Sequence, residues 1–219
     1  MNKELEGARI MCEKTENVIK SFVKTFKKNP WDFLYESDIQ GLLFSKIYSS
    51  LEEHTIKIPP EFPEVGGVHF NPVKTEYPYH SRFDIAILDS QLEKLKAHYA
   101  KLYPISPERY VAWGMPLQMG IEIKYCVPDY SVFQKYRDML SNVYKLEKYR
   151  RDSELSEKFI GLAMLFILSE SDAAELGHKE TGLKPGPEEL RPGIHAWIVT
   201  PREDEEIFEA EVSFPPHCS

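Results

Sequence analysis

Hydrophobic residues recur at helical spacing in the first quarter of the chain. Between residues 18 and 26 they are three or four positions apart, which predicts one amphipathic helix over residues 3–27. The pair Asn29-Pro30 either ends this helix or begins the next one early. A second helix is predicted up to about residue 54, starting with the capping-box spacing of Ser37 and Gln40. Its inward positions are Ile39, Leu42, Leu43, Phe44, Ile47 and Leu51.

The rest of the chain alternates strand-like and helix-like patterns. Alternation and short apolar runs predict strands at residues 83–88, 117–125, 159–168 and 194–200, and an edge strand near residues 207–212. Helical spacing predicts helices over residues 90–101 and 129–152. Proline and glycine predict loops over residues 56–80, with a short strand around 68–70, and over residues 176–192.

This order of elements predicts an α/β fold, with helices packed on a mixed sheet. The 219 residues, of which 42% are hydrophobic, suffice for one packed core, so we expect a single domain over residues 1–219. Within it we expect an N-terminal helix (1–29), a core that carries the chemistry (31–170) and C-terminal strands (193–212).

Composition excludes several classes of protein. The three cysteines are far apart and form no CxxC pair, which indicates reduced thiols in a cytoplasm. No apolar run has the length of a membrane span or the position of a signal core, so a cytoplasmic protein without membrane contact is expected. The spacings of zinc hydrolases, nucleotide-binding loops and acyl-transfer serines are missing from the sequence.

Two of the predicted strands each carry a carboxylate that is expected to leave the core. In the strand at 117–125, Gly120, Glu122 and Lys124 share one face, and the bare glycine is expected to leave room for an ion or a phosphate. In the strand at 83–88, Asp84 is expected on the face opposite Phe83. If the strands are neighbours, two carboxylates converge on a hard cation such as Mg²⁺ or Mn²⁺, and Lys124 stands beside it.

In this order of motifs the chain resembles the PD-(D/E)XK nuclease superfamily over roughly residues 31–168. The matching segments are Tyr35-Glu-Ser-Asp-Ile-Gln40, Arg82-Phe-Asp-Ile-Ala-Ile87 and Ile121-Glu-Ile-Lys-Tyr125. The resemblance implies a restriction-endonuclease-like mixed sheet flanked by helices, here with an N-terminal helical extension. It also implies metal ligands Asp84, Glu122 and Glu36, with Asp38 as the fallback for Glu36, and Lys124 as the catalytic cation.

The resemblance implies a Mg²⁺- or Mn²⁺-dependent nuclease that hydrolyses phosphodiester bonds, with DNA favoured over RNA. Two departures from the family pattern are Phe83 in place of the proline and the separation of 38 positions from Asp84 to Glu122, which is longer than usual. They keep open the alternative of a catalytically inactive protein that acts as a binding or assembly subunit. A homodimer would provide two centres for cutting two strands, but no residue requires one.

Charge is unevenly distributed along the chain, whose formal net charge is −8. Proteins that coat nucleic acid are usually basic overall, and this chain is acidic. Any binding of phosphates must therefore come from a local cluster of basic residues. Residues 135–151 have a local balance of +4, so this helix is either a phosphate track or an ordinary solvated face. On it, Lys145 or Asn142 is expected by resemblance to assist catalysis, and these two residues with Lys148 are the candidates for binding substrate.

Overall fold

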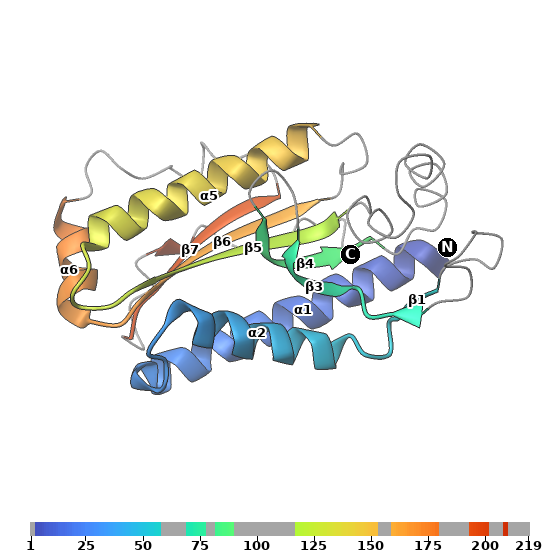
Figure 1. Cartoon of the computed structure of the whole chain (residues 1–219), viewed down its shortest axis with the longest axis horizontal. Coiled ribbons are helices and arrows are strands. Elements are labelled where there is room, and N and C mark those ends of the chain that lie inside the picture. Colours follow the sequence, from blue (N-terminus) through green and yellow to red (C-terminus); the bar gives the residue numbers. More distant parts are fainter. Residues whose placement is uncertain are drawn as a thin grey trace.

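The protein is a mixed α/β fold in which helices cover both faces of one sheet (Figure 1). The computed structural model describes residues 3–57, 69–77, 82–89, 117–152, 159–179, 193–201 and 208–209. The helices in these ranges are α1 (Lys3–Lys28), α2 (Glu36–Ser50), α5 (Val132–Asp152) and α6 (Glu170–Lys179), with a 3₁₀ turn η1 (Pro30–Asp32). The strands of the sheet are β3 (Val73–Tyr77), β4 (Phe83–Leu88), β5 (Leu117–Cys126), β6 (Ile160–Ile167), β7 (Ile194–Val199) and β8 (Phe208–Glu209). Strands β1 (Ile56–Lys57) and β2 (His69–Phe70) form a separate pair.

The sheet has the strand order β3-β4-β5-β6-β7-β8, with parallel pairing between β5, β6 and β7 and antiparallel pairing elsewhere. Strand β5 is longer than its neighbour β4. Their pairing runs from Leu88 opposite Leu117 to Ile85 opposite Ile121. The segment of β5 that follows Ile121 still pairs with β6, up to Cys126 opposite Ile167. The other edge of that segment therefore lies beyond the ladder with β4.

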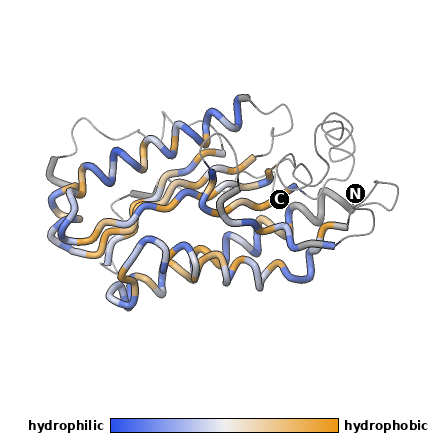
Figure 2. The backbone as a smooth tube through the Cα atoms, in the orientation of Figure 1, coloured by the Kyte–Doolittle hydropathy of each residue, from blue (hydrophilic) through white to orange (hydrophobic). Residues whose placement is uncertain are grey.

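Two hydrophobic clusters hold the layers together. On one face, Phe22 and Phe26 of α1 pack with Ile121 and Ile123 of β5. On the other face, the buried side of α5 packs with strand residues that include Leu165. Figure 2 shows hydrophobic positions concentrated in the strands, with hydrophilic positions along the outer side of α5. Helix α1 therefore contributes its apolar face to the core.

Most of the predicted elements are confirmed. The predictions for residues 3–27, 83–88, 117–125, 129–152, 159–168 and 194–200 correspond to α1, β4, β5, α5, β6 and β7, with ends that differ by at most three residues. Each has a long apolar stripe or a continuous apolar run that only one packing arrangement can bury. The predicted helix at 90–101 lies outside the described residues, as does most of the edge strand predicted at 207–212.

Two loop predictions are partly wrong. Residues 73–77, placed in the irregular segment 56–80, form β3, which pairs with β4 through Val73 opposite Ile87. In the part of this strand whose side chains are described, Val73 is buried, whereas Lys74 and Thr75 are not. Pairing with β4 therefore stabilises the strand more than its own pattern does. Residues 176–179, placed in a loop, are the last turn of α6. No helix in the described part of the chain is both long and apolar enough to cross a membrane.

Candidate functional site

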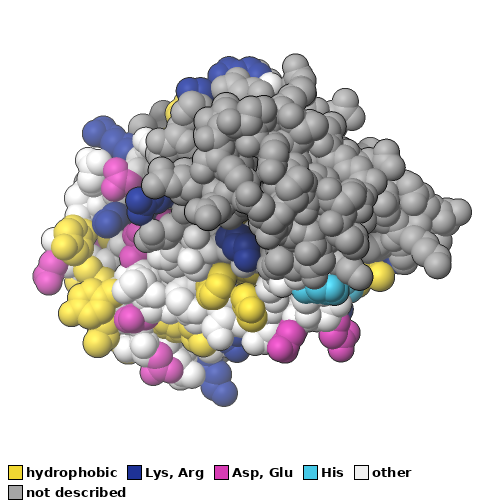
Figure 3. Space-filling view, turned by 45° about the vertical axis from the view of Figure 1, so that its right-hand side comes forward, with side chains coloured by type: hydrophobic (Ala, Val, Ile, Leu, Met, Phe, Trp, Pro, Cys, Tyr) yellow, Lys and Arg dark blue, Asp and Glu magenta, His cyan; other side chains and the backbone are white. Residues whose placement is uncertain are grey.

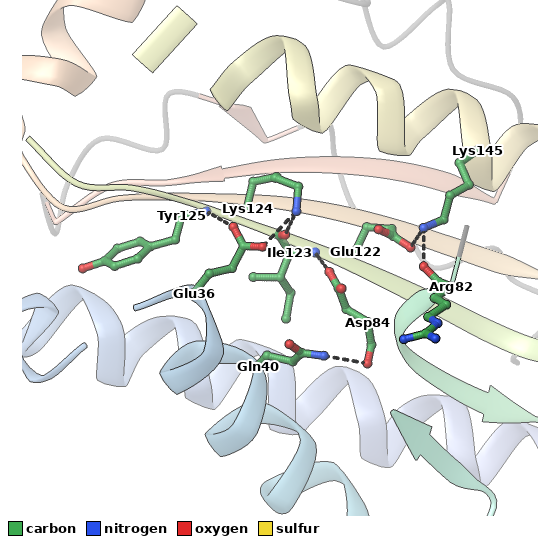
Figure 4. A network of polar contacts seen from close by, with 9 residues as sticks. All are labelled: Glu36, Gln40, Arg82, Asp84, Glu122, Ile123, Lys124, Tyr125 and Lys145. Atoms are coloured by element: carbon green, nitrogen blue, oxygen red, sulfur yellow. Dashed lines mark hydrogen bonds and ion pairs between the residues drawn. The ribbon is translucent and has the colours of Figure 1, made fainter. Parts of the chain in front are cut away.

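Asp84 accepts a hydrogen bond from the backbone of β5 just beyond the end of the pairing between β4 and β5. Its carboxylate Oδ2 accepts a hydrogen bond of 2.7 Å from the backbone N–H of Ile123 (Figure 4). A backbone N–H left unpaired inside a protein is costly, so this contact has a structural value whatever else Asp84 does. The backbone oxygen of Asp84 is also engaged, because it accepts a hydrogen bond of 3.1 Å from the Gln40 side chain.

Glu36 has the same role further along β5. Its Oε2 accepts a hydrogen bond of 3.1 Å from the N–H of Tyr125, and its Oε1 lies 2.9 Å from the Lys124 ammonium group. Lys124 also donates to the carbonyl of Ile123 at 2.8 Å, so its side chain folds back along its own strand (Figure 4). The first residue of α2 is thereby joined to the centre of the sheet.

The start of α2 is fixed by Asp38. Its carboxylate accepts hydrogen bonds of 2.9 Å from the N–H groups of Leu34 and Tyr35, and the helix begins at Glu36. The predicted cap by Ser37 and Gln40 is therefore wrong, because the chain turns two residues earlier. Asp38, the expected fallback for Glu36, is thus engaged in capping the helix. Glu36 itself, in the first turn, is directed toward β5.

Glu122 is almost completely buried, with 3% of its surface exposed, and its partner is Lys145 of α5. The Lys145 ammonium group forms an ion pair with Glu122 Oε1 and donates to the carbonyl of Arg82 at 2.5 Å. It also lies 5.1 Å from the centroid of the Phe83 ring. Register supports the expected proximity of the two strand carboxylates, because Asp84 and Glu122 are adjacent in sequence to the paired residues Ile85 and Ile121.

Burial dominates the electrostatics of the strand carboxylates. It raises the pKa of Glu122 to about 7, against the opposing charge of Lys145. It also raises the pKa of Asp84, against the hydrogen bond from Ile123. Burial disfavours the charged form of Lys124, but the hydrogen bond and the charge of Glu36 outweigh it, so the pKa of Lys124 is raised. The site thus holds carboxylates whose negative charge is incompletely neutralised.

Two geometric expectations need correction. A Cβ atom on Gly120 would lie 3.0 Å from Phe159 Cζ and 3.2 Å from Leu146 Cδ2, so core side chains fill the space that was expected for an ion or a phosphate. Phe83 packs on the α5 side, with its ring 5.4 Å from that of Tyr149, rather than on the face opposite Asp84. The strand alternation breaks at Phe83 because it follows Arg82, whose φ of 48° lies in the left-handed region.

Two participants were missed by sequence reasoning. Gln40 lies one turn after Glu36 on α2, so the i, i+4 spacing of the two side chains was a usable signal. Arg82 contributes its backbone carbonyl to Lys145, and backbone acceptors have no signature in sequence. Lys145, a candidate for assisting catalysis and binding substrate, lies inside the network on Glu122.

The other substrate-binding candidates do not join this network. Asn142 is half-buried, and its amide nitrogen makes no hydrogen bond within the described part of the protein. Lys148 is exposed on α5. Of the cations on this helix, Lys135 lies 5.2 Å from the Tyr130 ring and Arg150 donates to the carbonyl of Phe159 at 2.9 Å. The phosphate track expected along α5 is therefore reduced to its exposed cations, Arg137, Lys148 and Arg151.

Surface charge alone does not mark a nucleic-acid interface. Among the described side chains of the face in Figure 3, acidic and basic groups are interspersed, and hydrophobic groups lie at one edge and near the middle. The described chain contains large exposed hydrophobic residues, of which Trp31, Leu34 and Tyr35 shortly precede Glu36. The features that distinguish this region are therefore its buried carboxylates and its two lysines.

The carboxylates are not preassembled as a metal cage. In the ranges that the structure describes, no group of three or more His, Cys, Asp or Glu side chains is arranged to hold an ion. Asp84 and Glu36 are turned toward backbone N–H groups, and Glu122 toward Lys145. Comparison of the chain with protein-family models, with curated proteins and with solved structures finds no match in any of the three.

Proposed function

We propose that this protein is a metal-dependent nuclease of the PD-(D/E)XK type, with a restriction-endonuclease-like fold, that hydrolyses phosphodiester bonds in nucleic acid. One observation carries the proposal. Three separate elements bring four side chains into one network at the point where β5 extends beyond its pairing with β4, namely those of Asp84, Glu122, Lys124 and Glu36. These four residues are the ones that the order of motifs selects. DNA is favoured over RNA as the substrate, and a homodimer would supply a second centre for the second strand.

The donor set fits a hard divalent cation by its chemistry. Mg²⁺ and Mn²⁺ prefer carboxylate oxygens, and the site contains Asp84, Glu122 and Glu36. The raised pKa of Glu122 supports this fit, because a carboxylate buried with too little positive charge is stabilised when a cation arrives. Asp84 and Glu122 would hold the ion, with Glu36 completing the set after its present contacts rearrange.

Each side chain then has a chemical task. A bound divalent cation would polarise the phosphate and lower the pKa of a coordinated water. Lys124, kept protonated by Glu36, would stabilise charge that develops on the phosphate or orient the attacking water. Gln40 holds the backbone of Asp84 against α2 and thereby fixes the direction of that carboxylate.

A second candidate is favoured by the same contacts. The carboxylates already serve as caps for β5, and Lys145 already neutralises Glu122. A nuclease-like fold that has lost catalysis and acts as a binding or assembly subunit would keep these contacts for stability alone. Metal binding separates the two candidates, because only the nuclease needs the carboxylates to accept an ion.

The test is cleavage of labelled single- and double-stranded DNA and RNA in Mg²⁺ and in Mn²⁺. Wild type is compared with Lys124→Ala, Asp84→Asn and a control, Lys46→Ala, which changes an exposed lysine of α2. We expect metal-dependent cutting that falls at least about a hundredfold in the first two variants and is unchanged in the control. Equal cutting by Lys124→Ala would show that another protein is responsible. No cutting by wild type, together with no heat of Mn²⁺ binding, would favour the binding subunit.

A further inference from the structure

Lys145 provides an internal positive charge at the most buried carboxylate of the site. Its ammonium group contacts the Glu122 carboxylate, the carbonyl oxygen of Arg82 and the face of the Phe83 ring (Figure 4). Oxygen ligands on two sides are also the environment that a metal ion would need. The Lys145 side chain is 14% exposed, so water contributes little to the stabilisation of its charge. Lys145 therefore stands where a cation is required.

The position of Lys145 is not explained by the amphipathic pattern of α5. The buried stripe of this helix includes Val143, Leu146 and Tyr149, and Lys145 lies at its border. One turn further on, Lys148 is exposed. The Lys145 side chain crosses from the helix layer to the sheet. Because its stem is long and flexible, the ammonium group can occupy more than one position near the site. The contacts with Glu122 and Arg82 are made by the ammonium group at the end of this stem, so rotation of the side chain can break them without movement of the backbone.

We propose that Lys145 is a displaceable internal cation that occupies Glu122 in the metal-free protein and leaves it when a divalent ion binds. This inference rests on the proposed function, since it assumes that Glu122 is a metal ligand. Lys145 and the metal ion compete for one carboxylate, and two cations at the same buried oxygens repel each other. The released ammonium group remains tethered beside the site, where a phosphate would attract it.

The balance of charge supports the exchange. Three carboxylates, those of Asp84, Glu122 and Glu36, face two ammonium groups, those of Lys124 and Lys145. With its acids and lysines ionised, this cluster carries one net negative charge, and burial makes that charge costly. A divalent ion reverses the sign to positive, after which Lys145 is more stable near solvent or near a phosphate than near the ion. The exchange would link metal binding to the capture of substrate.

The competition can be measured by calorimetric titration of Mn²⁺ into wild type, Lys145→Met and Lys46→Met at one pH and one ionic strength. Lys145→Met keeps the apolar stem but removes the competing charge. We expect it to bind Mn²⁺ at least about tenfold more tightly, because the ion no longer has to break a charged hydrogen bond. The exposed control Lys46→Met should bind as wild type does. This readout does not require activity.

A second measurement uses only the wild-type protein, in case Lys145→Met does not fold. Brief acetylation with an amine-reactive reagent, followed by peptide mass spectrometry, gives the labelling rate of each lysine with and without Mn²⁺. We expect Mn²⁺ to raise the labelling rate of Lys145 several times over while that of Lys46 stays constant. Metal binding by wild type with no gain in Lys145→Met, or with Lys145 labelled at an unchanged rate, would overturn the inference and leave the proposed function intact. Failure of every variant to bind Mn²⁺ would instead overturn the proposed metal site, and this inference with it.

Discussion

The ammonium group of Lys124 lies 2.9 Å from the carboxylate of Glu36, although 88 residues separate them in the sequence. Lys124 shares one face of β5 with Glu122, two positions before it, but its ion pair is with a glutamate of another element. Glu122 pairs with Lys145 of α5, and Lys124 with the first residue of α2. Each of these two glutamates therefore has its own cation, and each contact joins β5 to a different helix layer.

Removal of the Glu36 carboxylate tests the link between α2 and the sheet. Glu36→Ala should lower the free energy of unfolding by about 1–2 kcal/mol, because it leaves the N–H of Tyr125 without its acceptor. Glu36→Gln, which keeps an acceptor but no charge, should cost less. Urea unfolding of both variants, followed by circular dichroism, gives the two values. Equal costs would show that the charge of Glu36 rather than its hydrogen bond matters.

The charge pair itself is expected to contribute little to stability. Both partners are partly exposed, so a double-mutant cycle with Glu36→Gln and Lys124→Met should give a coupling free energy below about 1 kcal/mol. The cycle is measured by the same unfolding experiment. A coupling of several kcal/mol would mean that the pair is a structural anchor, which would weaken its assignment to catalysis.

Two glycines should respond in opposite directions to alanine. Gly120→Ala inserts a methyl group against Phe159 and Leu146 and should destabilise the protein by about 1–3 kcal/mol. Gly41, inside α2, has no atom within 4 Å of an added Cβ, so Gly41→Ala should stabilise by about 0.5–1 kcal/mol. Thermal unfolding of the two variants checks both signs. A neutral Gly120→Ala would show that the space beside Glu122 is open after all.

The buried carboxyl group of Glu122 should make the protein less stable as the pH rises. Its pKa in the folded state is about 7, above the ordinary value of 4.5, so the folded state retains this proton in a range where the unfolded state has lost it. Between pH 4.5 and 8, wild type should lose up to about 3 kcal/mol of stability relative to Glu122→Gln. Urea unfolding across this range, with EDTA present, measures the difference. A difference that does not change with pH would contradict the burial of the charge.

His195 should produce the opposite dependence toward the other edge of the sheet. Burial, with the charge of Arg150, lowers the pKa of His195 to about 4, from an ordinary value of 6.5. As the pH falls from 6.5 toward 4, His195 takes up a proton in the unfolded state but not in the folded state. The free energy of unfolding therefore decreases toward acid pH. The loss should reach about 3 kcal/mol relative to His195→Gln, measured by urea unfolding between pH 7 and pH 4. Parallel curves for the two proteins would show that the imidazole is accessible to water.

The sequence by itself determined the elements with strong periodicity and the residues that carry chemistry. The isoleucines that alternate with Glu122 and Lys124 already predict a strand, because side chains of a strand point alternately to its two sides. The same reasoning separated Asp84 from Ile85 and Ile87 on β4. The expectation that Glu122 would leave the core was wrong, since α5 covers its face of the sheet and Glu122 is 3% exposed. The prediction was poorer for β3, which has no strong pattern of its own and depends on hydrogen bonds to a partner strand.

Only the tertiary structure decided which groups meet. The termination of the β4 ladder at Ile85 leaves N–H groups on β5, and these draw Asp84 and Glu36 toward the backbone. The packing of α5 on the sheet brings Lys145 to Glu122 and fills the space beside Gly120. Such contacts depend on distances between elements that are tens of residues apart along the chain. Local spacing predicts the face on which a side chain lies, whereas its partner is determined by the packing of the layers.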